Sequence, residues 1–364
     1  MRAVTTLALL GLVVTSCSGQ AAHKASFSPS ATSSAHASSS PHAASPPSAA
    51  SPPAGKRDSV VVATDGAIAD GVALARIGPD RIAHDLGRLR PPPIGSAVAA
   101  QEVSLSAGVA PQACVLWSAQ HVRSLQCYPF GDGKGVTVAG ADTSQSEMFG
   151  MSLSADGSHL AWLAQPHLTA NGGEYDLVTA HYAGGILTDQ HDDVVYSDRG
   201  GDCRYPFSTS WLADDRVVMA CSGANDASGG YAVQTLPVRA AAVPLLQRHR
   251  GRFNQFLDLV PYSPTEALAV ENHYCAITCA DGKPLEKPRA VRVDLRTGEV
   301  TSVVGFAAQG RRLGIVTGGS HGIIYTTAAQ DPPYGQERAY LELPGDGVGT
   351  LIRGLTGSVL AAQP

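Results

Sequence analysis

The chain of 364 residues is long enough to bury a large core, and 44% hydrophobic and 16% charged residues fit a globular protein. Aromatic residues make up only 6%, whereas 39 glycines and 24 prolines favour short strands and turns over long helices. Residues 1–57 carry four basic side chains and no acidic one, so residues 58–364 hold 22 basic and 31 acidic groups, a net charge of −9. This balance argues against a nucleic-acid partner, which needs a basic surface.

The first 17 residues have the features of a signal peptide. Arg2 precedes an apolar run, Leu7 to Val14, which is too short to span a bilayer. The tetrapeptide Val14-Thr15-Ser16-Cys17 resembles the lipobox of bacterial lipoproteins. The resemblance implies that cleavage leaves Cys17 at the N-terminus with diacylglycerol and palmitate chains, which anchor the protein to the extracytoplasmic face of the cell membrane. The alternative is an ordinary signal peptide in which Cys17 is incidental.

Residues 18–57 form a segment of low complexity. They consist almost entirely of Ser, Ala, Pro and His, with too little apolar surface to offset the entropy of ordering the chain. We therefore expect a disordered linker between the signal peptide, residues 1–17, and a folded domain over residues 58–364.

In the folded domain, short apolar runs alternate with Gly, Pro and Asp-Gly turns, which is the pattern of β-strands. The predicted strands and hairpins, in chain order, cover residues 59–63, 71–77, 114–118, 122–128, 151–164, 176–182, 207–221, 231–236, 259–263, 267–270, 290–294, 313–316, 323–327 and 339–343.

One unit of this pattern recurs. Turns at Ala155, Ala213, Pro264 and Gly319 are 58, 51 and 55 residues apart. Each turn precedes a strand that is apolar at consecutive positions, so we expect both faces of these strands to be covered. Four-stranded units that recur at this spacing without helices predict an all-β fold, a β-propeller. The domain length favours six blades of about 51 residues, with seven as the alternative.

The repeat also has a family resemblance. Residues 154–162, SADGSHLAW, resemble the S-P-D-G element of the TolB-type, WD40-like propeller repeat. The stretch from Trp211 keeps the spacing but lacks the Gly, and that from Ser263 keeps only the Ser-Pro start. Together with the lipobox, the chain resembles an actinobacterial propeller lipoprotein. The resemblance implies a binding scaffold outside the cytoplasm, gives no catalytic residue, and makes the Asp156-Gly157 turn structural.

The cysteines predict disulfides. Seven cysteines become six once Cys17 is lipidated, an even number in an exported chain. Six cysteines can form three disulfides in 15 ways. Local spacing favours one of these: Cys114 with Cys127 across a hairpin that turns at Gln120 and His121, Cys203 with Cys221, and Cys275 with Cys279. The alternative is a metal site made by His273, Cys275 and Cys279, which lacks a fourth nearby ligand.

The densest group of acidic and imidazole side chains lies in a stretch that we expect to be a long loop, residues 189–204. Long loops on a rigid scaffold often carry function. Solvated loop charge is the simpler explanation of the group, and a binding site is the alternative. The group consists of His191, Asp192, Asp193, Asp198 and Asp202.

Residues 318–322 match the G-x-S-x-G motif of a nucleophile elbow centred on Ser320. That motif requires a helix after the serine, whereas the β-rich run Ile323 to Thr327 follows here. We therefore interpret these residues as a glycine turn.

These features predict a lipid-anchored, extracytoplasmic propeller that binds an unidentified protein or cell-envelope ligand without catalysis, with no cofactor and no resident metal. The alternative is a propeller hydrolase or lyase with its site at the axial funnel, because a fold does not decide function. A sensory or accessory subunit of an envelope complex is a third reading. Converging carboxylates, histidines or a metal at the axis would favour the enzyme.

Overall fold

The computed structural model describes residues of the second of two compact units, Pro53–Pro364. The described residues are 59–65, 71–107, 111–130, 134–141, 143, 148–167, 174–196, 206–212, 216–222, 229–235, 238–244, 248–249, 252–275, 289–297, 299–307, 311–317, 322–329, 337–343 and 349–363. The signal peptide, Cys17 and the linker lie outside them and stay predictions. In the part of the chain that is described, no helix is long and apolar enough to span a membrane.

The described strands pair into six antiparallel sheets. The first sheet has the order β25-β1-β2-β3, from β25(Val359–Ala362), β1(Val60–Asp65), β2(Val72–Ile77) and β3(Ala83–Leu89). The second consists of β4(Ala99–Leu105), β5(Gln112–Ala119), β6(Val122–Pro129) and β7(Val136–Thr137). The third consists of β8(Phe149–Leu153), β9(His159–His167), β10(Glu174–Ala183) and β11(Ile186–Tyr196).

The other three sheets follow in chain order. The fourth consists of β12(Pro206–Trp211), β13(Arg216–Ser222), β14(Gly229–Thr235) and β15(Val238–Pro244). The fifth consists of β16(Arg248–His249), β17(Arg252–Pro261), β18(Glu266–Cys275), β19(Arg289–Asp294) and β20(Val300–Ala307). The sixth consists of β21(Arg311–Thr317), β22(Ile323–Ala329), β23(Arg338–Glu342) and β24(Thr350–Leu351).

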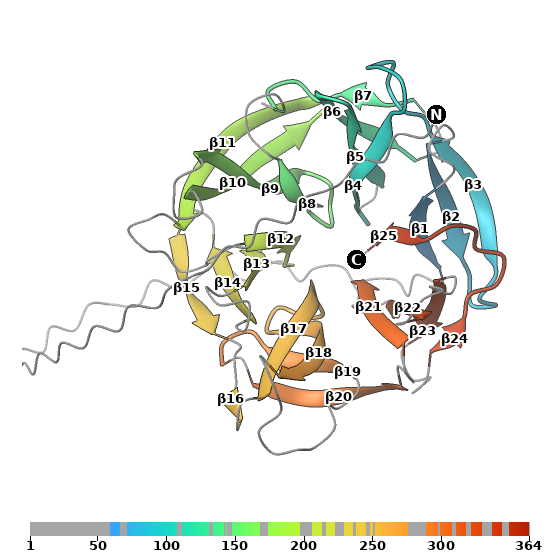
Figure 1. Cartoon of the computed structure of the whole chain (residues 1–364). Helices are drawn as coiled ribbons and strands as arrows, with labels where there is room; N and C mark the ends of the chain where they lie inside the picture. Colours follow the sequence, from blue (N-terminus) through green and yellow to red (C-terminus); the bar gives the residue numbers. More distant parts are fainter. Residues whose placement is uncertain are drawn as a thin grey trace, which may run out of the picture. The chain divides into compact units, whose positions relative to one another are not determined.

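The sheets follow one another around a common axis. Strand β25 contacts β4, β4 contacts β8, β8 contacts β12, β12 contacts β17, β17 contacts β21, and β21 returns to β25. One strand of each sheet therefore contributes to a closed inner circuit, while β3, β7, β11, β15, β20 and β24 end their sheets on the outside (Figure 1). This arrangement is the expected all-β propeller.

The two ends of the propeller domain close this circuit. Strand β25, near the C-terminus, is the innermost strand of the sheet whose other strands come from the start of the domain. Val62 pairs with Ala362 and Ala63 with Ala361. Gln363 extends the junction, because its backbone N–H donates to the Val61 carbonyl (2.9 Å) and its side-chain oxygen accepts from the Val61 N–H (3.2 Å). The Gln363 amide also donates to the carbonyl of Ser106, the residue after β4 (2.8 Å).

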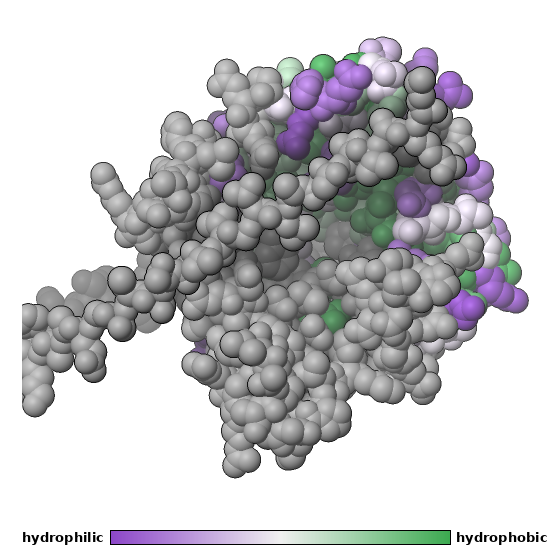
Figure 2. Space-filling view, in the orientation of Figure 1, coloured by the Kyte–Doolittle hydropathy of each residue, from purple (hydrophilic) through white to green (hydrophobic). Residues whose placement is uncertain are grey.

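The strands that follow the repeated turns are covered on both faces, as their sequences predict. Every residue is buried in the runs 160–164, 217–220, 267–270 and 323–327. Within β9, Leu160 and Trp162 pack with the second sheet's Leu116, whereas Ala161 and Leu163 pack with the fourth sheet. Alternate side chains thus enter different interfaces, and each sheet is buried between its two neighbours. Figure 2 shows hydrophilic residues along the outer edge of the first sheets, with hydrophobic residues further in.

Candidate functional site

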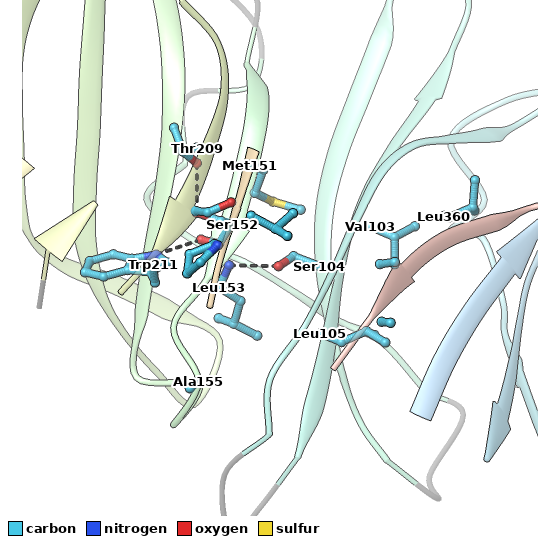
Figure 3. Close-up of a pocket in the computed structure, with 15 residues that line it drawn as sticks. Val103, Ser104, Leu105, Met151, Ser152, Leu153, Ala155, Thr209, Trp211 and Leu360 are labelled. Carbon is cyan, nitrogen blue, oxygen red and sulfur yellow. Dashed lines mark hydrogen bonds between the residues drawn. The ribbon is translucent and has the colours of Figure 1, made fainter. Parts of the chain in front are cut away.

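A cavity of about 180 Å³ lies among the inner strands β4, β8, β12, β17 and β25 (Figure 3). Its wall combines apolar side chains with small hydroxyl groups. The lining residues are Val103, Ser104, Leu105, Met151, Ser152, Leu153, Ala155, Thr209, Ser210, Trp211, Val260, Pro261, Leu360, Ala361 and Ala362. We call this space the axial cavity.

Hydroxyl and indole groups of the wall link neighbouring sheets. The Ser104 hydroxyl of β4 accepts a hydrogen bond from the Leu153 N–H of β8 (2.8 Å). The Thr209 hydroxyl of β12 donates to the Gly150 carbonyl and shares a hydrogen bond with the Ser152 hydroxyl (2.8 Å). The Trp211 indole N–H donates to the Ser152 carbonyl (3.0 Å). These wall groups therefore hold the second, third and fourth sheets together (Figure 3).

Glu102 on β4 makes a further link between the second and third sheets. Its two carboxylate oxygens accept hydrogen bonds from the backbone N–H groups of Gly150 (2.7 Å) and Met151 (2.5 Å). Burial raises the pKa of the Glu102 carboxyl above its ordinary value of 4.5, although both N–H donors and the Arg123 guanidinium act in the opposite direction. Both carboxylate oxygens are thus engaged in joining strands.

We expect Glu102→Gln to lower the free energy of unfolding by about 1–3 kcal/mol at pH 5, because a Gln side chain can accept only one of the two backbone hydrogen bonds. Because the pKa of Glu102 is higher in the folded than in the unfolded protein, its protonation stabilises the fold. This contribution is fully present below the unfolded-state pKa of Glu102 and is lost as the pH rises through its folded-state pKa. The deficit of the variant should therefore shrink from pH 5 to pH 8 in urea titrations.

The neighbouring residue Gln101 is exposed and provides the control. Gln101→Ala should change the free energy of unfolding by less than about 0.5 kcal/mol at every pH. A deficit of Glu102→Gln that grew with rising pH would contradict the assigned direction of the pKa shift.

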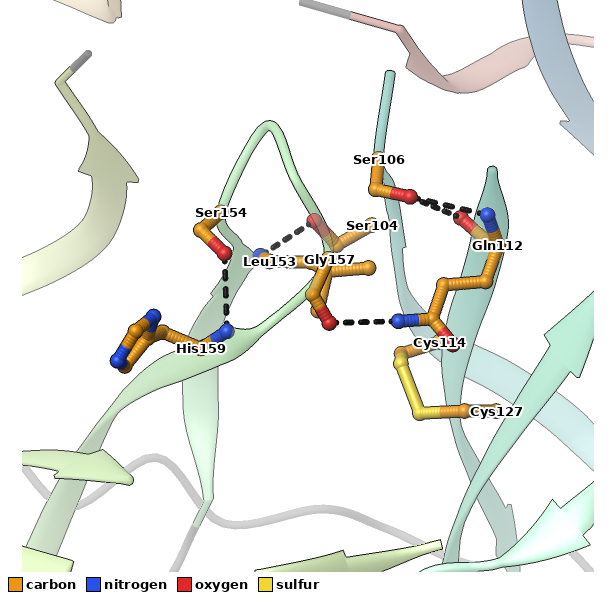
Figure 4. The surroundings of a disulfide bond; sticks show 9 residues. All are labelled: Ser104, Ser106, Gln112, Cys114, Cys127, Leu153, Ser154, Gly157 and His159. Atoms are coloured by element: carbon orange, nitrogen blue, oxygen red, sulfur yellow. Dashed lines mark hydrogen bonds between the residues drawn. A yellow bond between two sulfur atoms is a disulfide. The ribbon is translucent and has the colours of Figure 1, made fainter. Parts of the chain in front are cut away.

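The Asp156-Gly157 turn is structural, as predicted. The Asp156 carboxylate accepts hydrogen bonds from the hydroxyls of Ser154 (2.6 Å) and Ser158 (2.7 Å) and from the Ser158 N–H (3.0 Å). Burial alone would raise the pKa of Asp156, but these hydrogen bonds outweigh it and the pKa lies below its ordinary value. Gly157 has a φ of +79°, and a Cβ there would lie 2.7 Å from the amide nitrogen of Gln112, which binds its carbonyl (Figure 4).

The disulfide between Cys114 and Cys127 is present, as predicted. The two residues lie opposite each other on β5 and β6, with Cα atoms 4.1 Å apart, and Gln120 adopts a positive φ of 52° at the turn (Figure 4). Cys221 lies on β13 and Cys275 on β18. Their predicted partners, Cys203 and Cys279, lie outside the described residues, so these two pairings and the alternative metal site with His273 stay predictions.

The loop predicted over residues 189–204 is a strand over its first half, whereas a binding role of its acidic and imidazole side chains stays a prediction. His191, Asp192 and Asp193 lie in β11, where they pair with Thr179, Val178 and Leu177 of β10. The sequence does not indicate this strand because β11 is the outermost strand of its sheet, where one edge is exposed and polar residues are tolerated. None of the three lines the axial cavity. Asp198 and Asp202 lie outside the described residues.

Strand β22 directly follows the G-x-S-x-G motif, and its first residues are Ile323 and Ile324. A nucleophile elbow would require a helix there, so this strand agrees with the glycine-turn interpretation. Ser320 itself lies outside the described residues. Within the described ranges, no group of three or more His, Cys, Asp and Glu side chains is placed to hold a metal ion.

Sequence reasoning missed the residues of the axial cavity. A weak signal exists in retrospect, because three inner strands end on a serine followed by a large apolar residue. These pairs are Ser104-Leu105, Ser152-Leu153 and Ser210-Trp211. This signal is weak because the inner strands mix polar and apolar residues, whereas the buried strands beside them have strong apolar runs.

No protein-family model and no curated protein matches the sequence. The structure resembles a puromycin-hydrolyzing peptidase of Mycobacterium tuberculosis with a TM-score of 0.50 at 11% identity, over 81% of this chain and 44% of the peptidase. The present chain thus spans less than half of that protein. An oligogalacturonate lyase from Vibrio parahaemolyticus gives 0.45 at 10% identity, over 80% and 78%. The β-propeller domain of a Pyrococcus furiosus protease gives 0.42 at 9%, over 79% and 80%. At these identities the likeness concerns the fold alone.

Proposed function

We propose that this protein is a lipid-anchored propeller on the extracytoplasmic face of the cell membrane, where it binds a protein or envelope ligand without transforming it. The lipobox-like sequence ending at Cys17 supports the anchor, and the Ser- and Pro-rich residues 18–57 would let the domain extend from the membrane. We place the binding site at the axial cavity, which replaces the loop expected around His191.

The observation that carries the binding function is that polar groups of the cavity wall already make hydrogen bonds between neighbouring sheets. Ser104, Ser152 and Thr209 take part in hydrogen bonds between sheets, and Trp211 donates its indole N–H to the same network. Activating one of these hydroxyls as a nucleophile would break a link between inner strands. A rigid wall of apolar groups and fixed hydroxyls is suited to recognising a ligand by shape and a few hydrogen bonds.

We also propose that each of the six sheets is one blade. The sheets have four or five strands each. Their inner strands contact one another in a single circuit.

The alternative is an extracytoplasmic hydrolase or lyase that acts at the same axis. The solved structures that resemble this one include a puromycin-hydrolyzing peptidase and an oligogalacturonate lyase. Turnover of an aminoacyl anilide or of oligogalacturonate by the purified chain, lost on substitution of a cavity residue, would establish this alternative and contradict the proposal.

We expect Leu360→Lys to abolish ligand binding while leaving the fold intact. Leu360 lines the cavity and is 40% exposed, so a lysine there can reach solvent but places a charge in the wall of the cavity. Leu351, also 40% exposed, lies on the outer strand β24 and gives the matched control Leu351→Lys. When envelope extracts are passed over the immobilised proteins, the wild type and Leu351→Lys should retain the ligand and Leu360→Lys should not. Equal retention by both variants would contradict a site at the axis.

A further inference from the structure

We propose a second site, for a divalent transition-metal ion, formed by His159 of β9 and His181 of β10 beside Trp211. The site lies between the third and fourth sheets and is independent of the function proposed for the axial cavity. It would take an ion that prefers imidazole ligands, such as Cu²⁺ or Zn²⁺, with water completing the coordination.

The two histidines lie directly opposite each other on neighbouring antiparallel strands. One position further along, the Tyr182 N–H donates to the Ser158 carbonyl (2.7 Å). Because hydrogen-bonded and non-hydrogen-bonded pairs alternate along an antiparallel ladder, His159 and His181 form a non-hydrogen-bonded pair. Side chains of such a pair extend from the same face of the sheet and approach each other more closely. Both side chains are partly exposed, so an ion in solution can reach them.

The separation of the two rings matches that of two imidazoles on one ion. Their centroids are 5.3 Å apart and their planes make an angle of 80°. With metal–nitrogen bonds of about 2.0 Å and about 1.2 Å from nitrogen to ring centre, tetrahedral coordination places two imidazole centroids about 5.2 Å apart. The strand pairing therefore already supplies the spacing that metal binding requires.

Hydrogen bonds fix which nitrogen of His159 carries the proton. The Ser158 hydroxyl donates its one proton to the Asp156 carboxylate (2.7 Å), so its contact with His159 Nδ1 (2.8 Å) must be donated by the imidazole. In the neutral ring Nε2 is then left with a lone pair. This arrangement is the one found behind metal-binding histidines, whose other nitrogen donates to an oxygen acceptor.

Two further side chains, Thr188 and Trp211, contact the pair. Thr188 lies 3.4 Å from His181 Nδ1, which leaves Nε2 of that ring as the nitrogen for an ion. The Trp211 ring lies next to the His159 ring, with centroids 5.6 Å apart. Figure 4 shows the His159 ring directed away from Gln112 and the disulfide.

The test is a titration of the full-length protein with CuCl₂, followed by tryptophan fluorescence. Copper quenches indole emission at short range, and all three tryptophans lie outside the His-containing residues 1–57. We expect saturable quenching that is lost in His159→Gln and in His181→Gln. Ser158→Ala keeps both ligands but removes the acceptor behind Nδ1, so its copper affinity should fall about tenfold. Excess ZnCl₂ should shift the copper titration to higher concentrations.

The matched control is His121→Gln, because His121 is an exposed histidine at the β5–β6 turn. It should bind copper as the wild type does. Thermal unfolding without metal checks that each variant is folded, and Ser158→Ala still decides the question if a histidine variant is not. Wild-type quenching in His159→Gln and His181→Gln, or wild-type copper affinity in Ser158→Ala, would overturn the proposal.

Discussion

Deletion of residues 359–364 is expected to abolish cooperative unfolding of the propeller, a loss of at least about 5 kcal/mol, which is comparable to the whole stability of a typical domain. The deletion removes β25, which is the innermost strand of the first sheet and contacts β4 and β21 on either side. It exposes the edge of β1, whose residues 60–64 are buried. Urea unfolding monitored by circular dichroism and tryptophan fluorescence should then give a broad transition that differs between the two probes.

Two point variants of the same segment separate this effect from simple shortening of the chain. Gln363→Ala leaves the Val61 N–H and the Ser106 carbonyl without their side-chain partner and should cost about 2–4 kcal/mol. Leu360→Ala, at a 40% exposed position, should cost less than about 1 kcal/mol. A deletion variant that unfolded with the midpoint and cooperativity of the wild type would show that β25 does not close the circuit.

Cys17→Ala is expected to move the protein from the membrane fraction to the medium. Two acyl chains at about 0.8 kcal/mol per buried CH₂ hold a protein stably on a membrane, whereas the unlipidated chain has no such anchor. The measurement is fractionation of cells that express each variant, with labelled palmitate to detect the lipid.

Ser18→Ala is the control for this substitution, because it changes the next residue and keeps the cysteine. It should remain in the membrane fraction and carry label. If the wild type and Cys17→Ala both appeared unlabelled in the medium, residues 1–17 would be an ordinary signal peptide and the anchor would be wrong.

The propeller could be predicted because the apolar runs of its buried strands are compatible with few other structures. Leu160 to Ala164 are apolar at five consecutive positions, and only a strand covered on both faces buries all five. The pairing of Cys114 with Cys127 followed from the same local reasoning, since a short turn fixes which residues are opposite.

Outer strands and ring closure could not be predicted in this way. Strand β11 carries His191 to Asp193, which read as loop residues because an edge strand has little to bury. Strand β25 pairs with β1 across nearly the full length of the domain, and nothing local in residues 359–362 indicates that partner. The axial cavity depends on both, because its wall is assembled from inner strands far apart in the sequence.

The most direct test of the account is photo-cross-linking at two positions in living cells. A benzophenone amino acid would replace Leu360, in the wall of the axial cavity, or Leu351, on the outer strand β24, in the otherwise native protein. We predict one discrete adduct at position 360, absent at 351 and lost in Cys17→Ala, where the protein leaves the membrane. An adduct at 351 alone, or identical adducts at both positions, would contradict a membrane-anchored propeller that binds its ligand at the axis.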